Sequence, residues 1–187
     1  MNASQTGVSA ALSAYCALLN SGTLVFLSGT QPATPETALS GNTTLCTATY
    51  SSTAFGTPSF SSPNMQATGS FTAGSYTPTA AGTSTFCRAY ESNGTTVIAD
   101  LTVGSNWIAS QAAVLGQYCL SSGNTYKVTT AGTSSTTAPS GTTTFSDGTV
   151  TWTYVGAGQL FDVLISNPAI QLAVPVSCSQ TMKMPAV

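Results

Sequence analysis

Only one stretch of this chain has the spacing of a helix, and most of the chain after it has the pattern of short β-strands. In residues 7–20, GVSAALSAYCALLN, apolar side chains recur at three- and four-residue intervals: Val8, Leu12, Tyr15 and Leu19. Thr6 or Ser9 could cap the start, and the Asn-Ser-Gly sequence at 20–22 would end the helix. We favour a helix that covers the end of a β core over a helix that docks on a partner.

From residue 23 onward, short runs rich in β-branched and aromatic residues alternate with turn formers: TLVFLSG, LCTATYS, STFCRAYES, TTVIADLTVG, QLFDVLIS and AIQLAVPVSCS. Asn93-Gly94 predicts a two-residue hairpin turn. Residues 57–85, rich in Pro, Ser, Thr and Gly, predict long loops or edge strands. The expected fold is all-β: a jelly-roll-like β-sandwich with one short N-terminal helix and a small inserted β module.

The inserted module is expected at residues 105–157. The strand TTVIADLTVGS ends before this segment and the strand QLFDVLIS follows it, while the residues between are rich in Ser, Thr and Gly. Because hairpin tips tolerate insertions, we expect a core domain of residues 1–104 and 158–187 interrupted by a separate unit. A lid belonging to the core domain is the alternative.

Charge is scarce, and this excludes several classes of function. Charged residues are 4% of the 187, three cations and five acids, against roughly 25% in an average globular domain. Three scattered cations cannot form the basic stripe that nucleic acid or an anionic membrane surface requires. No run approaches the roughly 20 apolar residues that span a bilayer. We therefore expect no nucleic acid and no membrane as partners.

Catalytic and metal-binding groups are equally sparse. The chain has no histidine, which excludes Ser-His-Asp, Cys-His and imidazole–metal arrangements. The five acids lie in separate segments, and Asp147-Gly148 and Asp100 are explained by a turn and a strand end. Five widely spaced cysteines without a CxxC pair predict buried thiols of a protein made in a reducing cytoplasm, and the opening MNASQTGVSAALSAY lacks a signal-peptide pattern. We expect no enzyme, no catalytic residue, no metal and no cofactor.

Aromatic residues of the insertion offer one candidate binding site. Aromatic rings can bind carbohydrate by stacking on the apolar faces of sugar rings. The candidate residues are Trp107, Tyr126, Trp152 and Tyr154, with Tyr118 nearby. In a strand TWTY, Trp152 and Tyr154 share one face, which is either a binding platform or the module's core. A unit of about fifty residues has so little interior that its large aromatics usually form its core. We favour the core.

The strands around the insertion resemble a known group. The passage ALSAYCALLNSGTLVFLSGTQPATPETALSGNTTLCTATYSSTAFG resembles the opening of small phage and prophage virion proteins, with an ALCALLNSG-type helix, a GTQPA-type turn and an AFG motif. The later passage CRAYESNGTTVIADLTVG resembles a strand–hairpin–strand of the same group. The insertion is similar to a module of phage head and tail proteins, and to chitin-binding-type carbohydrate modules at Trp107, Gly116 and Tyr126. There Ala113 replaces an aromatic and Cys119 an aliphatic residue.

The resemblance implies a non-enzymatic capsid decoration, or cement, protein on the exterior of a virion, made in the bacterial host cytoplasm. Its expected partners are the major capsid protein and further copies of itself, as a homo-dimer or homo-trimer. The alternative is a head- or tail-fibre adhesion component whose inserted module binds a glycan. A third interpretation is a tail or head-completion protein.

Overall fold

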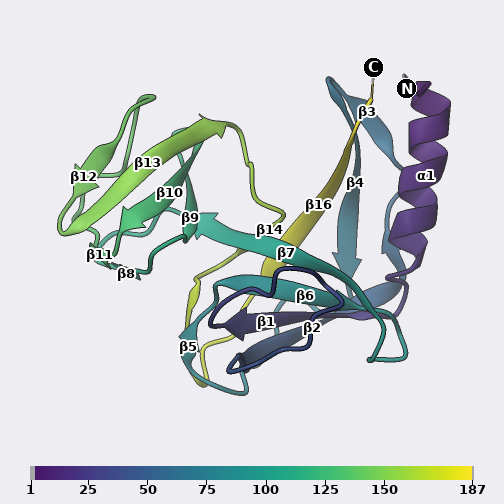
Figure 1. Cartoon of the computed structure of the whole chain (residues 1–187), viewed down its shortest axis with the longest axis horizontal. Helices are drawn as coiled ribbons and strands as arrows, with labels where there is room; N and C mark the ends of the chain where they lie inside the picture. The colour runs from purple at the N-terminus through teal and green to yellow at the C-terminus, as the bar shows by residue number, and fades with distance from the viewer. Residues whose placement is uncertain (1–2, 187) are drawn as a thin grey trace.

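In the computed structural model, which describes residues 3–186, β-strands account for nearly half of the chain and one helix precedes the strands (Figure 1). The prediction of an all-β chain with one short N-terminal helix is confirmed. The strands, in chain order, are β1 (Thr23–Ser28), β2 (Thr43–Phe55), β3 (Ser59–Ser61), β4 (Asn64–Phe71), β5 (Gly82–Thr83), β6 (Phe86–Tyr90), β7 (Val97–Asn106), β8 (Ala112–Ala113), β9 (Tyr118–Ser121), β10 (Asn124–Thr130), β11 (Gly132–Thr133), β12 (Phe145–Asp147), β13 (Val150–Ala157), β14 (Val163–Ile165), β15 (Ala169–Ile170) and β16 (Cys178–Pro185).

Seven strands close into a barrel in the order β1-β2-β4-β16-β14-β7-β6, with β6 returning to β1. All neighbours in this ring are antiparallel except β14 and β7, which run parallel. Closure satisfies the backbone groups that an open sheet would leave at its edges. The jelly-roll-like arrangement stays a prediction.

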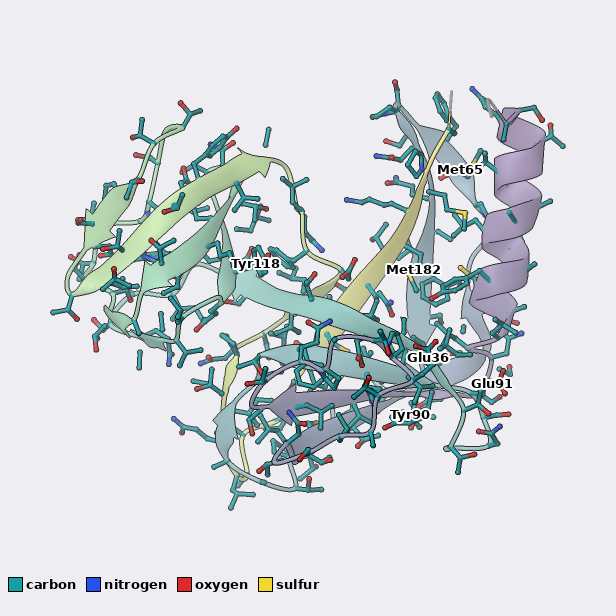
Figure 2. All side chains as sticks on the ribbon, viewed as in Figure 1. Glu36, Met65, Tyr90, Glu91, Tyr118 and Met182 are labelled. Atoms are coloured by element: carbon teal, nitrogen blue, oxygen red, sulfur yellow. The ribbon has the colours of Figure 1, made fainter. Side chains whose placement is uncertain are left out.

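Helix α1 (Gln5–Ala17) packs against β4, β16 and β2. Its N-cap is Ser4, whose hydroxyl accepts a hydrogen bond from the Gly7 N–H at 3.2 Å, so the helix begins two residues before the predicted range and neither Thr6 nor Ser9 caps it. Its predicted stripe is buried at Val8 and Leu12. Met65 and Met182, labelled in Figure 2 on β4 and β16, belong to the buried core that the helix shares with these strands.

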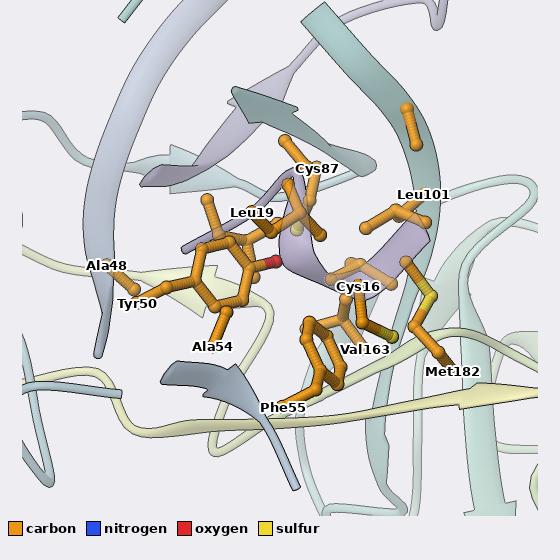
Figure 3. Packing of buried hydrophobic residues seen from close by; sticks show 14 of the residues in the cluster. Cys16, Leu19, Ala48, Tyr50, Ala54, Phe55, Cys87, Leu101, Val163 and Met182 are labelled. Atoms are coloured by element: carbon orange, nitrogen blue, oxygen red, sulfur yellow. The ribbon is translucent and has the colours of Figure 1, made fainter. Parts of the chain in front are cut away.

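The main hydrophobic core joins the helix to the barrel interior. Tyr50 is fully buried at its centre and donates a hydrogen bond to Gln180 Oε1 at 2.6 Å. Its ring stacks on Phe71 at 4.9 Å between centroids, and Figure 3 shows Phe55 and Cys16 packed nearby. Tyrosine is tolerated here because its hydroxyl finds an acceptor inside the core.

Strand β7 leaves the barrel and continues into a second group of strands. Its last residues pair in parallel with β9, and β10, β13 and β12 extend that sheet in order. A second hydrophobic cluster lies there, formed only by residues between 107 and 154. This cluster is separate from the main core. The proposed domain boundaries at 105 and 157 stay a prediction.

Three local predictions were wrong. Asn93-Gly94 does not make a two-residue turn: β6 and β7 pair last at Tyr90 and Val97, and the longer loop is closed by an Asn93 side chain that accepts from the Thr95 and Thr96 N–H groups. The run AIQLAVPVSCS is not one strand, because a turn at 171–174 separates β15 from β16. Asp100 does not end a strand but lies within β7.

Candidate functional site

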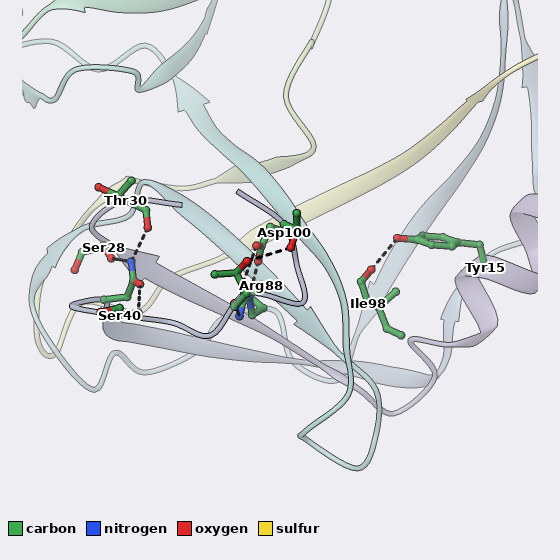
Figure 4. A network of polar contacts seen from close by, with 10 residues as sticks. Tyr15, Ser28, Thr30, Ser40, Arg88, Ile98 and Asp100 are labelled. Carbon is green, nitrogen blue, oxygen red and sulfur yellow. Dashed lines mark hydrogen bonds and ion pairs between the residues drawn. The ribbon is translucent and has the colours of Figure 1, made fainter. Parts of the chain in front are cut away.

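A buried pair of charged side chains in the barrel has a structural role. Arg88 on β6 and Asp100 on β7 form an ion pair in which both side chains are about 3% exposed, with Nε–Oδ1 at 2.6 Å and Nη2–Oδ2 at 2.8 Å. A third guanidinium nitrogen donates to the Thr37 carbonyl at 3.0 Å. Figure 4 shows Arg88 beside Asp100, and, elsewhere on the loop that contains Thr37, the Asn42 amide donates to the Ser28 and Thr30 carbonyls. Together these contacts hold the loop 29–42 against the barrel wall.

The second cluster is organised around a buried carboxylate that the sequence indicated only as a turn residue. Asp147 is 1% exposed and lies at the β12–β13 hairpin, where Gly148 adopts a φ of 62°. Its carboxylate accepts hydrogen bonds from the Ser135 N–H at 2.6 Å, from the Ser135 hydroxyl, and from Trp107 Nε1 at 3.0 Å. One side chain therefore joins the hairpin, the 135 loop and the end of β7.

These donors set the ionisation of Asp147. Burial alone would raise its pKa, but hydrogen bonds from the hydroxyl and N–H of Ser135, and from the indole of Trp107, hold the pKa below its usual value. The Trp152 N–H is close enough to favour the ionised carboxylate, although no hydrogen bond of normal geometry links the two and this N–H is left without a partner. The carboxylate is thus a charged structural centre.

The four aromatic residues proposed as a sugar site come together in this cluster. Tyr126 is fully buried and donates to the Gly141 carbonyl at 2.7 Å, and Trp152 is 3% exposed. The rings of Tyr154 and Tyr126 pack edge to face with their centroids 6.0 Å apart. Tyr154 and Trp107 are partly buried against the cluster. The cavity beside the two tryptophans has room for about one water molecule. The structure places all four in or against a core, with no row of open ring faces.

Cysteines are free and sheltered from solvent. Cys16, Cys46, Cys87 and Cys119 are buried, and Cys178 is partly buried. Desolvation raises the pKa of Cys16 to about 11, and those of Cys119 and Cys178 to about 12. Within residues 3–186, no group of three or more His, Cys, Asp or Glu side chains is arranged to hold a metal ion.

The outer surface is nearly neutral. The charged side chains left fully or partly open to solvent around the barrel include Glu36 and Glu91, labelled in Figure 2. Aliphatic side chains project from loops instead: Leu115 is 68%, Leu172 58% and Val174 53% exposed. Sequence reasoning missed the last two because AIQLAVPV has strand-like composition, and only Pro175 hinted at an interruption.

A shallow groove runs along α1. Helix residues line one side, and the segment from the end of β2 to β3 lines the other, including Phe55, Pro58 and the 44% exposed Phe60. No charged residue lines the groove. Sequence reasoning did not anticipate this surface, because it depends on how far β3 stands from the helix.

Within residues 3–186, no helix has the length and hydrophobicity to cross a membrane. Comparisons with protein-family models, with curated proteins and with solved structures found no match to this chain.

Proposed function

We propose that this protein decorates the exterior of a phage capsid and stabilises the shell by binding across its major capsid subunits. The observation that carries the proposal is the surface: of eight charged residues, Arg88, Asp100 and Asp147 lie inside the fold, and the five fully or partly exposed ones are scattered over an outside that is mostly hydroxyl, amide and aliphatic groups. Low surface charge disfavours life as a free protein and favours permanent assembly. The sequence resemblance to small phage virion proteins supports the same function.

The proposed mechanism is interfacial and not enzymatic. Asp100, Asp147 and Asp162 each accept hydrogen bonds from neighbouring residues of the fold, which gives these acids structural tasks. Backbone and hydroxyl hydrogen bonds, together with aliphatic side chains such as Leu172, would join the jelly-roll-like core to the shell. Self-association as a dimer or trimer would add multivalency across symmetry-related sites.

A salt titration tests this proposal. Purified protein is mixed with capsids that lack it and bound protein is measured by co-sedimentation. Because surface ion pairs are screened within a few ångströms at 1 M salt while apolar contacts are not, binding should change less than about threefold between 50 mM and 1 M NaCl. Hundreds of copies per virion, roughly one or more per capsomer, are expected. Failure to bind capsids, or absence of the polypeptide from virions, would refute the decoration role, and a dozen copies would favour the tail or head-completion interpretation.

The adhesion alternative depends on residues 105–157. The observation that supports it is the aromatic content of this segment. Tyr118 is partly exposed, and the Nζ atom of Lys127 lies 5.2 Å from the centre of the Tyr118 ring. Because Tyr126 and Trp152 are buried, glycan binding would need other surfaces of the module. A glycan array probed with the full chain at millimolar sugar decides the point, and reproducible binding that survives substitution of Tyr118 would require a different site.

A further inference from the structure

The groove beside α1 has a strand edge as one of its borders. β3 pairs with β4 through Ser59↔Gln66, Phe60↔Met65 and Ser61↔Asn64, and within residues 3–186 no strand pairs with its other side. In an antiparallel ladder, alternate residues direct their N–H and C=O groups away from the partner strand. All three β3 residues are exposed, so this edge is open to another backbone.

Two longer open strand segments carry features that discourage such pairing. Beyond Gln180, β16 pairs only with β4, and that half contains Lys183 and Pro185. Beyond Trp152, β13 pairs only with β10, and there an extra residue at Val155 makes a bulge. Edge lysines, prolines and bulges are the usual means of preventing strand addition. β3 is short, but it has no charge, no proline and no register shift.

The helix side of the groove is uncharged, and apart from Gln5 and Cys16 its α1 side chains are small. The small ones are Thr6, Ser9, Ala10, Ser13 and Ala17. The floor is the face of the β3–β4 hairpin that carries Phe60 and Met65, which are directly opposite one another. A strand added to β3 would direct alternate side chains over this floor toward α1. A charged side chain placed there would lose hydration without gaining an ionic partner.

We propose that this groove binds an extended, uncharged polypeptide segment of a partner protein, which adds to the open edge of β3 as a further strand. Main-chain hydrogen bonds to β3 would supply affinity, and the small residues of α1 would select against charged and bulky side chains. In a virion the segment would belong to a shell subunit, and in that identification alone the inference rests on the proposed function.

The test uses a matched pair of variants on one helix. Ala10 lines the groove, whereas the neighbouring Ala11 is exposed on α1 and does not line it. Random ten-residue peptides displayed on yeast are selected against the full-length protein, and the enriched peptides are then titrated against both variants. We expect uncharged peptides whose Kd rises about tenfold or more with Ala10→Glu and is unchanged with Ala11→Glu. Equal unfolding temperatures of the two variants would establish that both are folded.

Hydrogen exchange supplies a second readout that needs no variant. The selected peptide should slow exchange of backbone amides within 59–61, because strand addition protects amides on the open edge. Peptides that bind without protecting β3, selections that yield no peptide discriminating between the two variants, or enrichment of charged sequences would each overturn the inference. Since no capsid is involved, these results are independent of whether the protein binds capsids.

Discussion

Replacing Asp147 by asparagine should destabilise the second cluster more than replacing any exposed acid does. The carboxylate accepts three hydrogen bonds inside the fold, two from Ser135 and one from Trp107. Asparagine keeps the shape but removes the charge, and its NH₂ must face at least one of these donors. Hydrogen bonds to a charged group contribute about 1.5–3 kcal/mol, and an unsatisfied buried donor costs about 1–3 kcal/mol. We expect Asp147→Asn to lower the free energy of unfolding by about 3 kcal/mol.

The direction of the Asp147 pKa shift determines how the stability difference changes with pH. The folded-state pKa of Asp147 lies below the ordinary value of 3.8, so its stabilising effect is present above pH 3.8 and is lost as the pH falls through the lower folded-state pKa. The difference between wild type and Asp147→Asn should therefore be full at about pH 7 and shrink below about pH 4.

Urea unfolding followed by tryptophan fluorescence measures both effects, since both tryptophans belong to or pack against this cluster. The matched control is Glu36→Gln, an exposed acid, for which a change within about 0.5 kcal/mol is expected. If the two variants unfold alike at pH 7, the carboxylate is not the centre of this cluster. A difference that persists undiminished at pH 2 would show that its charge is not what matters.

Three further experiments test the buried ion pair, the buried Tyr50 and the buried thiols. Arg88→Met leaves Asp100 buried and unpaired and should cost about 3–5 kcal/mol, whereas the double variant Arg88→Met/Asp100→Leu should recover much of the loss in urea unfolding. Tyr50→Phe should cost about 1–3 kcal/mol in the same assay, because Gln180 Oε1 loses its donor in the core; an unchanged midpoint would contradict this. A thiol reagent at pH 8 should label the native protein much more slowly than the urea-unfolded protein, because the thiols are wholly or partly buried and their pKa values are raised above the ordinary one; labelling of Cys16, Cys119 and Cys178 at the unfolded rate would contradict this.

Local patterns in the sequence predicted the elements better than their boundaries. The stripe from Val8 to Leu19 predicted the helix because a single buried face determines it. The hairpin at Asn93 was mistaken because its side chain accepts two backbone N–H groups and stabilises a longer loop. The run from Ala169 to Val176 was mistaken because a turn that places Ala173 at a φ of 65° has no glycine to mark it.

The buried Asp147 site could not be predicted from local sequence patterns, because it depends on contacts between distant residues. Asp147 was correctly placed at a turn, but its burial depends on Ser135 and Trp107, which lie 12 and 40 residues away in the chain. Tyr126 and Trp152 were expected in a core on grounds of module size, and both lie in one. The barrel closure between β6 and β1, and the open edge of β3, follow from strand order, which short-range patterns do not encode.

The placement of the charges connects the fold to the proposed interfaces. A chain with so few charged residues could have used them all for solubility, yet Arg88 and Asp100 hold the loop 29–42, and Asp147 holds the second cluster. The remaining surface has few charges for electrostatic complementarity, which ordinarily supplies specificity and association rate. Selection must then come mainly from shape and from backbone hydrogen bonds, and these need rigid loops and accessible edges. The buried charges provide the rigidity, and β3 provides an edge without a charge or a proline to block it.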